Sequence, residues 1–229
     1  MIEQQPNLKR TVRSFVRREG RMTGAQKRAL QDLWSTFGIG DDLSFDGKFI
    51  FGDQRPLTLE IGFGDGQVLI GMAKQNPGVG FLGIDPHRPG VGRLLHELAR
   101  EDILNVRVMI GDAGEIVPRA ITEHTLERIL VFFPDPWPKK RHHKRRLLND
   151  VFLGVLANRL KQNGTLHVAT DWIEYAQEIL DAVDRAPLLQ NAAGQGNFSP
   201  RPDWRPLTKY ERRGLNLGHR VFDILAHRT

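Results

Sequence analysis

Three acidic residues stand at the ends of apolar stretches that are typical of buried β-strands. Glu60 lies in LTLEIG, Asp85 ends VGFLGID, and Asp112 follows NVRVMIG. Glu60 suits a cationic ligand, Asp85 suits ribose hydroxyls and Asp112 suits an adenine amino group, because carboxylates accept hydrogen bonds and attract positive charge. A single acid at a strand end is often only a helix cap. The combination of three therefore indicates a ligand site.

A glycine-rich turn, LEIGFGDG, follows the first of these stretches. Its glycines Gly62, Gly64 and Gly66 allow a tight turn and let the backbone approach a ligand at the start of the next helix. Taken alone, this pattern is equally typical of a simple turn. A dinucleotide site favours G-x-G-x-x-G, but the sixth position here is Gln67. Together with the acids, the turn favours S-adenosylmethionine as the cofactor, with NAD as the second candidate.

One more acid is enclosed by prolines in VFFPDPWPKKRHHKRRLL, residues 131–148. Asp135 ends the fourth predicted strand beside the cofactor crevice, so we expect it where the cofactor's methyl group meets a substrate. Trp137 either stacks on a base or packs the turn. Such a charge run is often only a solvated helix start. However, positive charge opposes the macrodipole at a helix N-terminus, which favours a role in binding phosphates. The run consists of Lys139, Lys140, Arg141, His142, His143, Lys144, Arg145 and Arg146.

Strands and helices alternate along the chain from residue 57 onward. This alternation predicts a doubly wound α/β fold with a mostly parallel, Rossmann-like sheet of seven strands, of which the last is antiparallel. Ligands bind such sheets at the carboxyl ends of the strands, where the acids lie. The predicted strands cover 57–62, 79–85, 105–111, 127–133, 164–170, 187–193 and 219–227. The predicted helices cover 24–37, 67–75, about 90–101, about 144–161 and 172–183.

The composition is that of a soluble globular protein, with 229 residues of which 40% are hydrophobic and 26% are charged. The net charge of +6 favours a polyanionic partner. The absence of cysteine excludes disulfides and thiolate metal sites. No apolar run approaches the length of a membrane span, and the first residues lack the pattern of a secretory signal. We therefore expect a cytoplasmic protein.

The first fifty residues differ from the rest of the chain. We expect residues 1–50 to form a basic N-terminal arm and a helix, and residues 51–229 to form the main domain. The arm is equally typical of a solvated tail and of a segment that contacts nucleic acid. Its cations are Lys9, Arg10, Arg13, Arg17, Arg18 and Arg21.

A set of motifs in this order resembles the bacterial tRNA (guanine-N7-)-methyltransferases. The motifs are LEIGFGDG, GIDPHRPGVGRLL, GDA, FFPDPWPKKRHHKRRL, ATDW and TKYERRGLNLGHRVFDI, within residues 57–226. The resemblance implies that 51–229 is an S-adenosylmethionine-dependent methyltransferase domain of class I fold. It also implies transfer of a methyl group to N7 of a guanosine in the tRNA variable loop, at position 46, to give 7-methylguanosine.

The resemblance also assigns roles to individual residues. It implies that Glu60, Asp85, Asp112 and Asp135 bind S-adenosylmethionine, and that Asp135 is the active-site residue. It implies substrate contacts for Lys139, Asp171, Thr208, Lys209, Tyr210 and Glu211. The family often has Glu at the position of Asp85 and Phe at that of Tyr210. From the residues alone, Asp171 is equally typical of a helix cap, and Glu211 of an ion pair with Arg212 or Arg213. We expect His219 to support its motif structurally.

Methyl transfer to N7 needs no base, because this nitrogen carries a lone pair and no proton. We therefore expect positioning and electrostatics to supply most of the acceleration, with Asp135 and Asp171 as candidates for stabilising the guanine's growing charge. The expected partner is tRNA, without DNA, membrane or metal, and the protein is a monomer or a homodimer. Two other classes are a nicotinamide-dependent oxidoreductase, disfavoured by the glycine pattern, and a non-catalytic RNA-binding protein, disfavoured by the intact acids.

Overall fold

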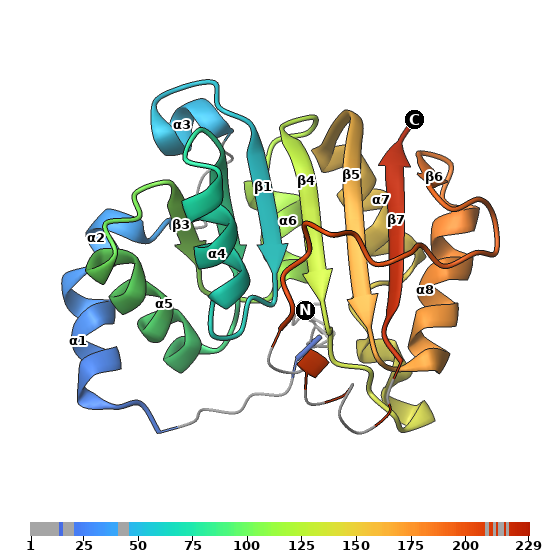
Figure 1. Cartoon of the computed structure of the whole chain (residues 1–229), viewed down its shortest axis with the longest axis horizontal. Helices are drawn as coiled ribbons and strands as arrows, with labels where there is room; N and C mark the ends of the chain where they lie inside the picture. The colour runs from blue at the N-terminus through green and yellow to red at the C-terminus, as the bar shows by residue number, and fades with distance from the viewer. Residues whose placement is uncertain are drawn as a thin grey trace, which may run out of the picture.

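Seven strands form one mixed sheet in the order β3-β2-β1-β4-β5-β7-β6 (Figure 1). The computed structural model describes residues 14–15, 21–40, 46–208, 211–212, 214, 218 and 220–229. Strands β1 to β5 are parallel, and β7 is antiparallel to both β5 and β6. The predicted sheet is therefore confirmed. The strands are β1 (Leu57–Ile61), β2 (Gly80–Ile84), β3 (Val106–Met109), β4 (Leu126–Phe132), β5 (Leu160–Thr170), β6 (Leu189–Asn191) and β7 (Phe222–Arg228).

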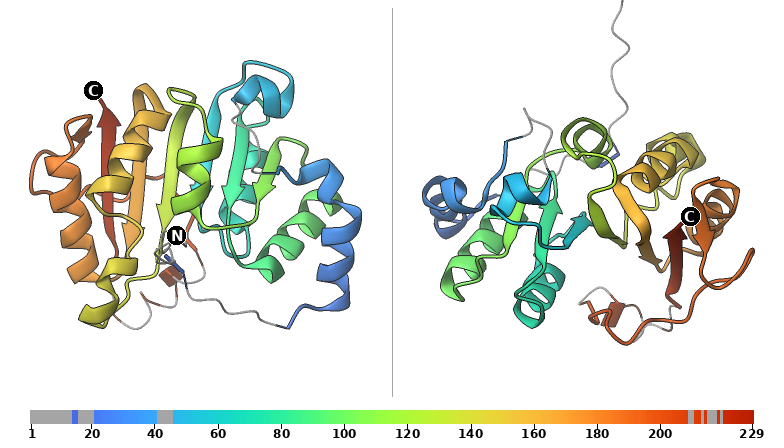
Figure 2. Two further views of the ribbon diagram at one scale, coloured as in Figure 1. Left: turned by 180° about the vertical axis from the view of Figure 1, so that it is seen from behind. Right: turned by 90° about the horizontal axis from the view of Figure 1, so that it is seen from above.

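Helices cover both faces of the sheet (Figures 1 and 2). Ile116, Leu153 and Ile179 of α6, α7 and α8 belong to the core on one face. Leu69 and Leu94 of α4 and α5 belong to the core on the other. Burial on both faces explains why β1 and β2 read as continuous apolar runs. These helices are α4 (Gln67–Gln75), α5 (Arg88–Arg100), α6 (Ala113–Ala120), α7 (Asp150–Arg159) and α8 (Ile173–Arg185).

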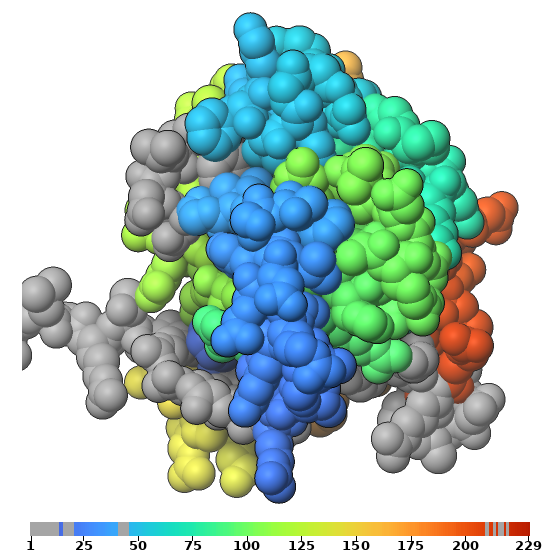
Figure 3. Space-filling view, turned by 90° about the vertical axis from the view of Figure 1, so that its left-hand side faces the viewer, coloured from blue at the N-terminus to red at the C-terminus, as the bar shows by residue number. Residues whose placement is uncertain are grey.

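The single helix predicted over 24–37 consists of two helices, α1 (Gly24–Asp32) and α2 (Trp34–Phe37). Thr23 begins α1 with a capping box, in which its hydroxyl and the side chain of Gln26 bond each other's backbone N–H groups. α1 lies against α5, and α2 contacts β3 at the edge of the sheet; Figure 3 views the molecule from this side. A Cβ on Gly92 of α5 would lie 2.6 Å from the Gln26 carbonyl oxygen, so this contact requires glycine.

The basic run does not begin an α-helix, as the helix predicted over about 144–161 implied. It forms a 3₁₀ helix, η1 (Lys140–Arg145), whereas α7 starts at Asp150. Asn149 caps α7 by accepting the backbone N–H of Phe152 at 3.1 Å. The cations therefore lie outside α7, and the macrodipole gives no argument about them.

Other strand boundaries also differ from the predicted ones. β5 begins at residue 160 rather than 164, and β7 begins at 222 rather than 219. Two short helices, α3 (Gly47–Phe51) and α6, were not predicted; α6 contains Pro118, which is unusual inside a helix. None of the helices in the described part of the chain is both long and apolar enough to cross a membrane.

Candidate active site

The glycine turn joins β1 to α4 at the point where the strand order reverses. Gly62, Gly64 and Gly66 all have positive φ, at 75°, 59° and 76°, a conformation that strongly favours glycine. Gly66 also allows close helix packing, because a Cβ there would lie 2.6 Å from Leu94. A Cβ on Gly62 or Gly64 would meet nothing within 4 Å, so open space lies beside the backbone.

Asp85 holds this turn to the end of β2. Its carboxylate accepts the backbone N–H of Gly64 at 2.8 Å and that of His87 at 2.7 Å. Burial raises the pKa of Asp85, while these two backbone N–H groups lower it. Each carboxylate oxygen keeps a second lone pair, so Asp85 retains the capacity to accept ribose hydroxyls.

Glu60 is a buried acid within β1, with 3% of its surface exposed. Its Oε2 atom has no hydrogen-bond partner among the described residues. Burial raises the pKa of Glu60 to about 8, and the charges of Asp85 and Asp65 add to this effect. A buried acid without a partner is costly, and a cationic ligand would relieve that cost. This observation fits the positive charge of S-adenosylmethionine.

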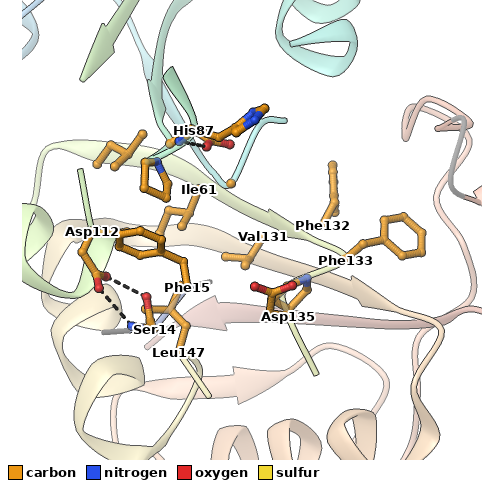
Figure 4. Close-up of a pocket in the computed structure, with 16 residues that line it drawn as sticks. Ser14, Phe15, Ile61, His87, Asp112, Val131, Phe132, Phe133, Asp135 and Leu147 are labelled. Carbon is orange, nitrogen blue, oxygen red and sulfur yellow. Dashed lines mark hydrogen bonds between the residues drawn. The ribbon is translucent and has the colours of Figure 1, made fainter. Parts of the chain in front are cut away.

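Asp112 caps α6 by accepting the backbone N–H of Gly114 at 2.9 Å. The same carboxylate accepts the backbone N–H of Ser14 at 3.0 Å and its hydroxyl at 2.7 Å (Figure 4). Ser14 and Phe15 come from the predicted basic arm and carry no motif that would have indicated a place at this site. The arm thus contacts the acid that was predicted to face adenine.

These groups surround a cavity of about 400 Å³ at the carboxyl edge of the sheet (Figure 4). Gly62, Asp85, Asp112 and Asp135 line it together. The other predicted cofactor residues, Glu60, Gly64 and Gly66, lie in the adjoining strand and turn rather than in the lining. Acids at the rim and apolar side chains between them suit an adenosyl group with a charged sulfur. The apolar lining includes Ile61, Ile84, Val131, Phe132 and Phe133.

The Pro134–Pro136 turn carries Asp135, which is exposed at the cavity. Phe133 and Trp137, on either side of it, have positive φ of 53° and 47°, a conformation that costs of order 1–3 kcal/mol in a non-glycine residue. The Trp137 indole donates to the Ser14 carbonyl at 3.1 Å, and only 8% of Trp137 is exposed. Trp137 therefore packs the turn, and the base-stacking alternative is wrong in this structure.

The basic run divides into exposed and buried members. Lys139, Lys140, Arg141 and Lys144 are exposed, whereas His142, His143 and Arg145 are half-buried. Arg145 lies over the Trp137 ring. Desolvation lowers the pKa of His142, and the nearby cations lower it further. The permanent positive charge that faces solvent therefore comes from the lysines and Arg141.

Arg146 corrects the predicted set of phosphate contacts. Its side chain is only 3% exposed and pairs with Glu178 at 2.5 Å. Its Nε donates to the Pro136 carbonyl at 2.8 Å, and its guanidinium lies 4.9 Å from the Tyr175 ring centre. Because Arg146 is buried and bonded to Pro136, it supports the turn that carries Asp135. It does not present its charge on the surface, where RNA would bind.

The predicted substrate residues that the structure describes, Lys139, Asp171, Thr208 and Glu211, lie outside the cavity lining. Asp171 is exposed at the end of β5, and Trp172 rather than Asp171 holds the N-cap position of α8. The Thr208 hydroxyl accepts the backbone N–H of Glu211 at 3.1 Å. Glu211 is 2% exposed and pairs with Arg205 and Arg201, not with Arg212. Lys209, Tyr210, Arg213 and His219 lie outside the described residues.

Comparison with known proteins agrees with this geometry. A family model described as a putative methyltransferase matches residues 54–224. A tRNA (guanine-N(7)-)-methyltransferase of Alkalilimnicola ehrlichii is 49% identical over 221 residues, covering 94% of this chain and 92% of that protein. One of Pseudomonas aeruginosa is 48% identical over 222 residues, covering 96% of this chain and 91% of that protein. The chain belongs to the tRNA (guanine-N(7)-)-methyltransferase family.

Solved structures show that the family fold is shared with other methyltransferases. A 30S ribosomal A1408 methyltransferase from an uncultured bacterium has a TM-score of 0.55 at 15% identity, covering 79% of this chain and 91% of that one. An aminoglycoside resistance methyltransferase has a TM-score of 0.51 at 14% identity, covering 92% and 95%. Family membership removes the oxidoreductase alternative. Among the described residues, no group of three or more His, Cys, Asp or Glu side chains is arranged to hold a metal.

Proposed function

We propose that this protein transfers a methyl group from S-adenosylmethionine to N7 of the guanosine at position 46 of the tRNA variable loop. One observation carries the proposal: Gly62, Asp85, Asp112 and Asp135 line one cavity, and the exposed cations Lys139, Lys140, Arg141 and Lys144 follow Asp135 closely in the chain. The identity of 48–49% to relatives named tRNA (guanine-N(7)-)-methyltransferase supports it. A protein acting on tRNA belongs in the cytoplasm.

Each acid around the cavity has a distinct part in holding the cofactor, which supplies an electrophilic methyl group on a positively charged sulfur. Glu60 provides the buried negative charge that balances this positive charge. Asp85 accepts from the ribose hydroxyls through its free lone pairs, while its backbone contacts keep the turn in place. Asp112 accepts from the adenine amino group. The apolar walls exclude water from the transfer path.

For this reaction the protein has to position the two reactants and stabilise the charge that develops on the guanine. N7 of guanine attacks with its own lone pair, so no residue has to remove a proton. The ring becomes cationic during the transfer, and a carboxylate nearby stabilises this charge. Asp135 reaches the cavity from the Pro134–Pro136 turn and Asp171 stands at the end of β5. We assign both to the electrostatic stabilisation and placement of guanine.

The tRNA binds across the carboxyl edge of the sheet. Lys139, Asp171, Thr208, Lys209 and Tyr210 contact the guanosine in this proposal. Phosphates meet the rest of the basic run without Arg146, which leaves Lys140, Arg141, His142, His143, Lys144 and Arg145. The target base leaves its tertiary contacts to enter the site, at an unstacking cost of a few kcal/mol at most.

Asp135→Ala tests the function and the site together. We expect turnover to fall at least about a hundredfold, because a preorganised charge at the developing cation is lost, while tRNA affinity stays within about twofold. The measurement is 7-methylguanosine in digests of bulk tRNA incubated with enzyme and labelled methyl donor. Asp181→Ala, which removes an exposed acid of α8, is the matched control. A wild-type protein that binds tRNA without forming 7-methylguanosine would instead be a non-catalytic binder.

A further inference from the structure

The segment of described residues 192–208, which follows β6 in the chain, covers part of the sheet that none of the described helices covers. It crosses the face that carries α4, in front of β7, β5 and β4, and then descends toward the carboxyl ends of β4 and β5 (Figures 1 and 2). The backbone N–H of Ser199 bonds to the Asp223 carbonyl at 2.8 Å, so the crossing begins attached to β7. The descent leads to Thr208 and Glu211, which the family resemblance links to the substrate.

A buried arginine fixes this segment to the sheet. The side chain of Arg205 is fully buried and donates to both carboxylate oxygens of Glu211, each at 2.6 Å. Its other side contacts Asp223 of β7, with Nε 2.9 Å and Nη2 3.2 Å from the carboxylate. A planar guanidinium between two carboxylates fixes direction as well as distance, which a lysine cannot do.

The network continues to the wall of the cavity. His167 of β5 contacts Asp223 through Nε2 at 2.6 Å. Burial lowers the pKa of His167, so the neutral ring donates this hydrogen bond and adds no positive charge. The ring packs edge-on against Phe132, which lines the cavity, at 5.0 Å between ring centres. Glu211 is thus connected to the cavity wall through Arg205, Asp223 and His167.

The network is poorly explained as a source of stability. Apolar residues of similar volume often hold a segment as well as buried ions do, because ions lose hydration on burial. What the arginine supplies is a fixed position. The Thr208 hydroxyl accepts the Glu211 N–H at 3.1 Å, and the Arg212 N–H bonds to the Thr208 carbonyl at 3.0 Å. A shift of Glu211 therefore shifts Thr208.

We propose that Arg205 is a positioning residue for methyl transfer, and that Glu211 acts through Arg205 rather than by contacting the guanine. This inference rests on the proposed function. It assigns Glu211 to holding the segment that carries Thr208, and not to contacting the substrate. Arg205 engages both carboxylate oxygens of Glu211, and 2% of the residue is exposed. Unlike Asp85, Glu211 is not among the described residues that line the cavity. Among the described residues that the resemblance links to the substrate in this segment, Thr208 then remains as the one that can contact the guanine.

The test compares two tRNA transcripts, with guanosine or inosine at position 46. Inosine keeps N7 and lacks the 2-amino group that a carboxylate would read. We expect Glu211→Gln and Arg205→Lys each to lower kcat about tenfold to a hundredfold, by the same factor on both transcripts, since misplacement does not depend on the amino group. Cofactor affinity should stay within about twofold. A loss for Glu211→Gln on guanosine but not on inosine would show direct reading and overturn the proposal.

Hydrogen–deuterium exchange adds a readout that does not depend on turnover. Both variants should lose protection in residues 198–208 while β1 and β2 keep theirs. Arg212→Lys is the matched control, because this arginine follows Glu211 directly and is exposed, and it should leave the protection unchanged. Unchanged protection in Arg205→Lys would contradict the proposal. A wild-type protein that methylates neither transcript would instead refute the proposed function, so the two failures are distinct.

Discussion

At the scale of single residues, burial changes the acid–base chemistry of Glu60. Its pKa is raised from 4.5 to about 8, first by burial and then by the charges of Asp85 and Asp65. The folded protein therefore holds a proton that the unfolded chain loses at lower pH. This contribution is fully present below about pH 4.5, shrinks as the pH rises, and is gone above about pH 8.

Without cofactor, the protein should lose stability between pH 5 and pH 8 more steeply than a Glu60→Gln variant. The additional slope is at most about 1.4 kcal/mol per pH unit, because one proton is involved. The free energy of unfolding measured by denaturant at several pH values checks this. Parallel pH profiles for the two proteins would show that Glu60 ionises normally in the fold.

Cofactor binding should lower the pKa of Glu60 again, because the positive sulfur favours the ionised carboxylate. If the sulfonium cofactor binds the ionised form of Glu60, binding near neutral pH releases close to one proton, since most of the protein starts protonated at a pKa of about 8. Calorimetry in two buffers with different ionisation enthalpies measures the released proton. Glu60→Gln should bind more weakly and release none. Equal proton release from both proteins would mean that another group supplies it.

At the scale of elements, η1 and the Pro134–Pro136 turn act as one unit. Exposed members of η1 present charge, while Arg146 directly after it holds the Pro136 carbonyl from inside. The cations therefore stand at a fixed place relative to Asp135.

The salt dependence of tRNA binding should distinguish the exposed cations of the basic run from the buried Arg146. Arg141→Gln should weaken tRNA binding and reduce the slope of log affinity against log salt by about 1, as expected for one lost phosphate contact. Fluorescence titrations at several salt concentrations measure this slope. Arg100→Gln, which removes an exposed arginine at the end of α5, is the matched control and should leave the slope unchanged.

Arg146→Gln should behave differently from Arg141→Gln. It leaves the half-buried Pro136 carbonyl without the Arg146 donor and removes the buried guanidinium from its pair with Glu178, which together cost about 1–3 kcal/mol of stability. A variant that kept full stability and lost one unit of salt slope would return Arg146 to the RNA surface.

The elements also show what the sequence predicts and what it cannot. Strands such as β1 and β2 are buried on both faces, so their apolar runs predict them directly. The ends of these runs then identify the acids and glycines at the carboxyl ends of the strands. Arg141 and Arg146 were not separable, because the same residue type serves solvent or core depending on tertiary packing. The contacts of Ser14 with Asp112 and of Arg205 with Asp223 join distant parts of the chain. No local pattern encodes such pairs.

At the scale of the whole molecule, the described helices before residue 40 share the core of the main domain. Ala29, Leu30 and Phe37 belong to the same hydrophobic cluster as residues of α4 and α5. The backbone of Gly38 also pairs with that of Val108 in β3. α1 and α2 therefore pack into the core of the main domain, and the division at residue 50 stays a prediction.

Two glycine substitutions test this attachment. Gly92→Ala should destabilise the protein by about 1–3 kcal/mol, because the new Cβ would lie 2.6 Å from the Gln26 carbonyl and push α1 away. Gly71→Ala in α4 is the matched control, since its Cβ meets nothing within 4 Å. That change should stabilise by up to about 1 kcal/mol through helix propensity. Denaturant unfolding measures both, and equal effects would show that α1 yields without cost.

The place of β7 has a consequence for the protein during its synthesis. β7 is made after β6, yet it lies between β5 and β6. A growing chain that has reached only β6 already holds the parallel strands and their cofactor acids. It still lacks Asp223, the anchor of Arg205, and the edge of β5 has no neighbour. An open apolar strand edge favours pairing with other chains, so the nascent protein is most vulnerable to aggregation in the interval before residues 222–228 emerge.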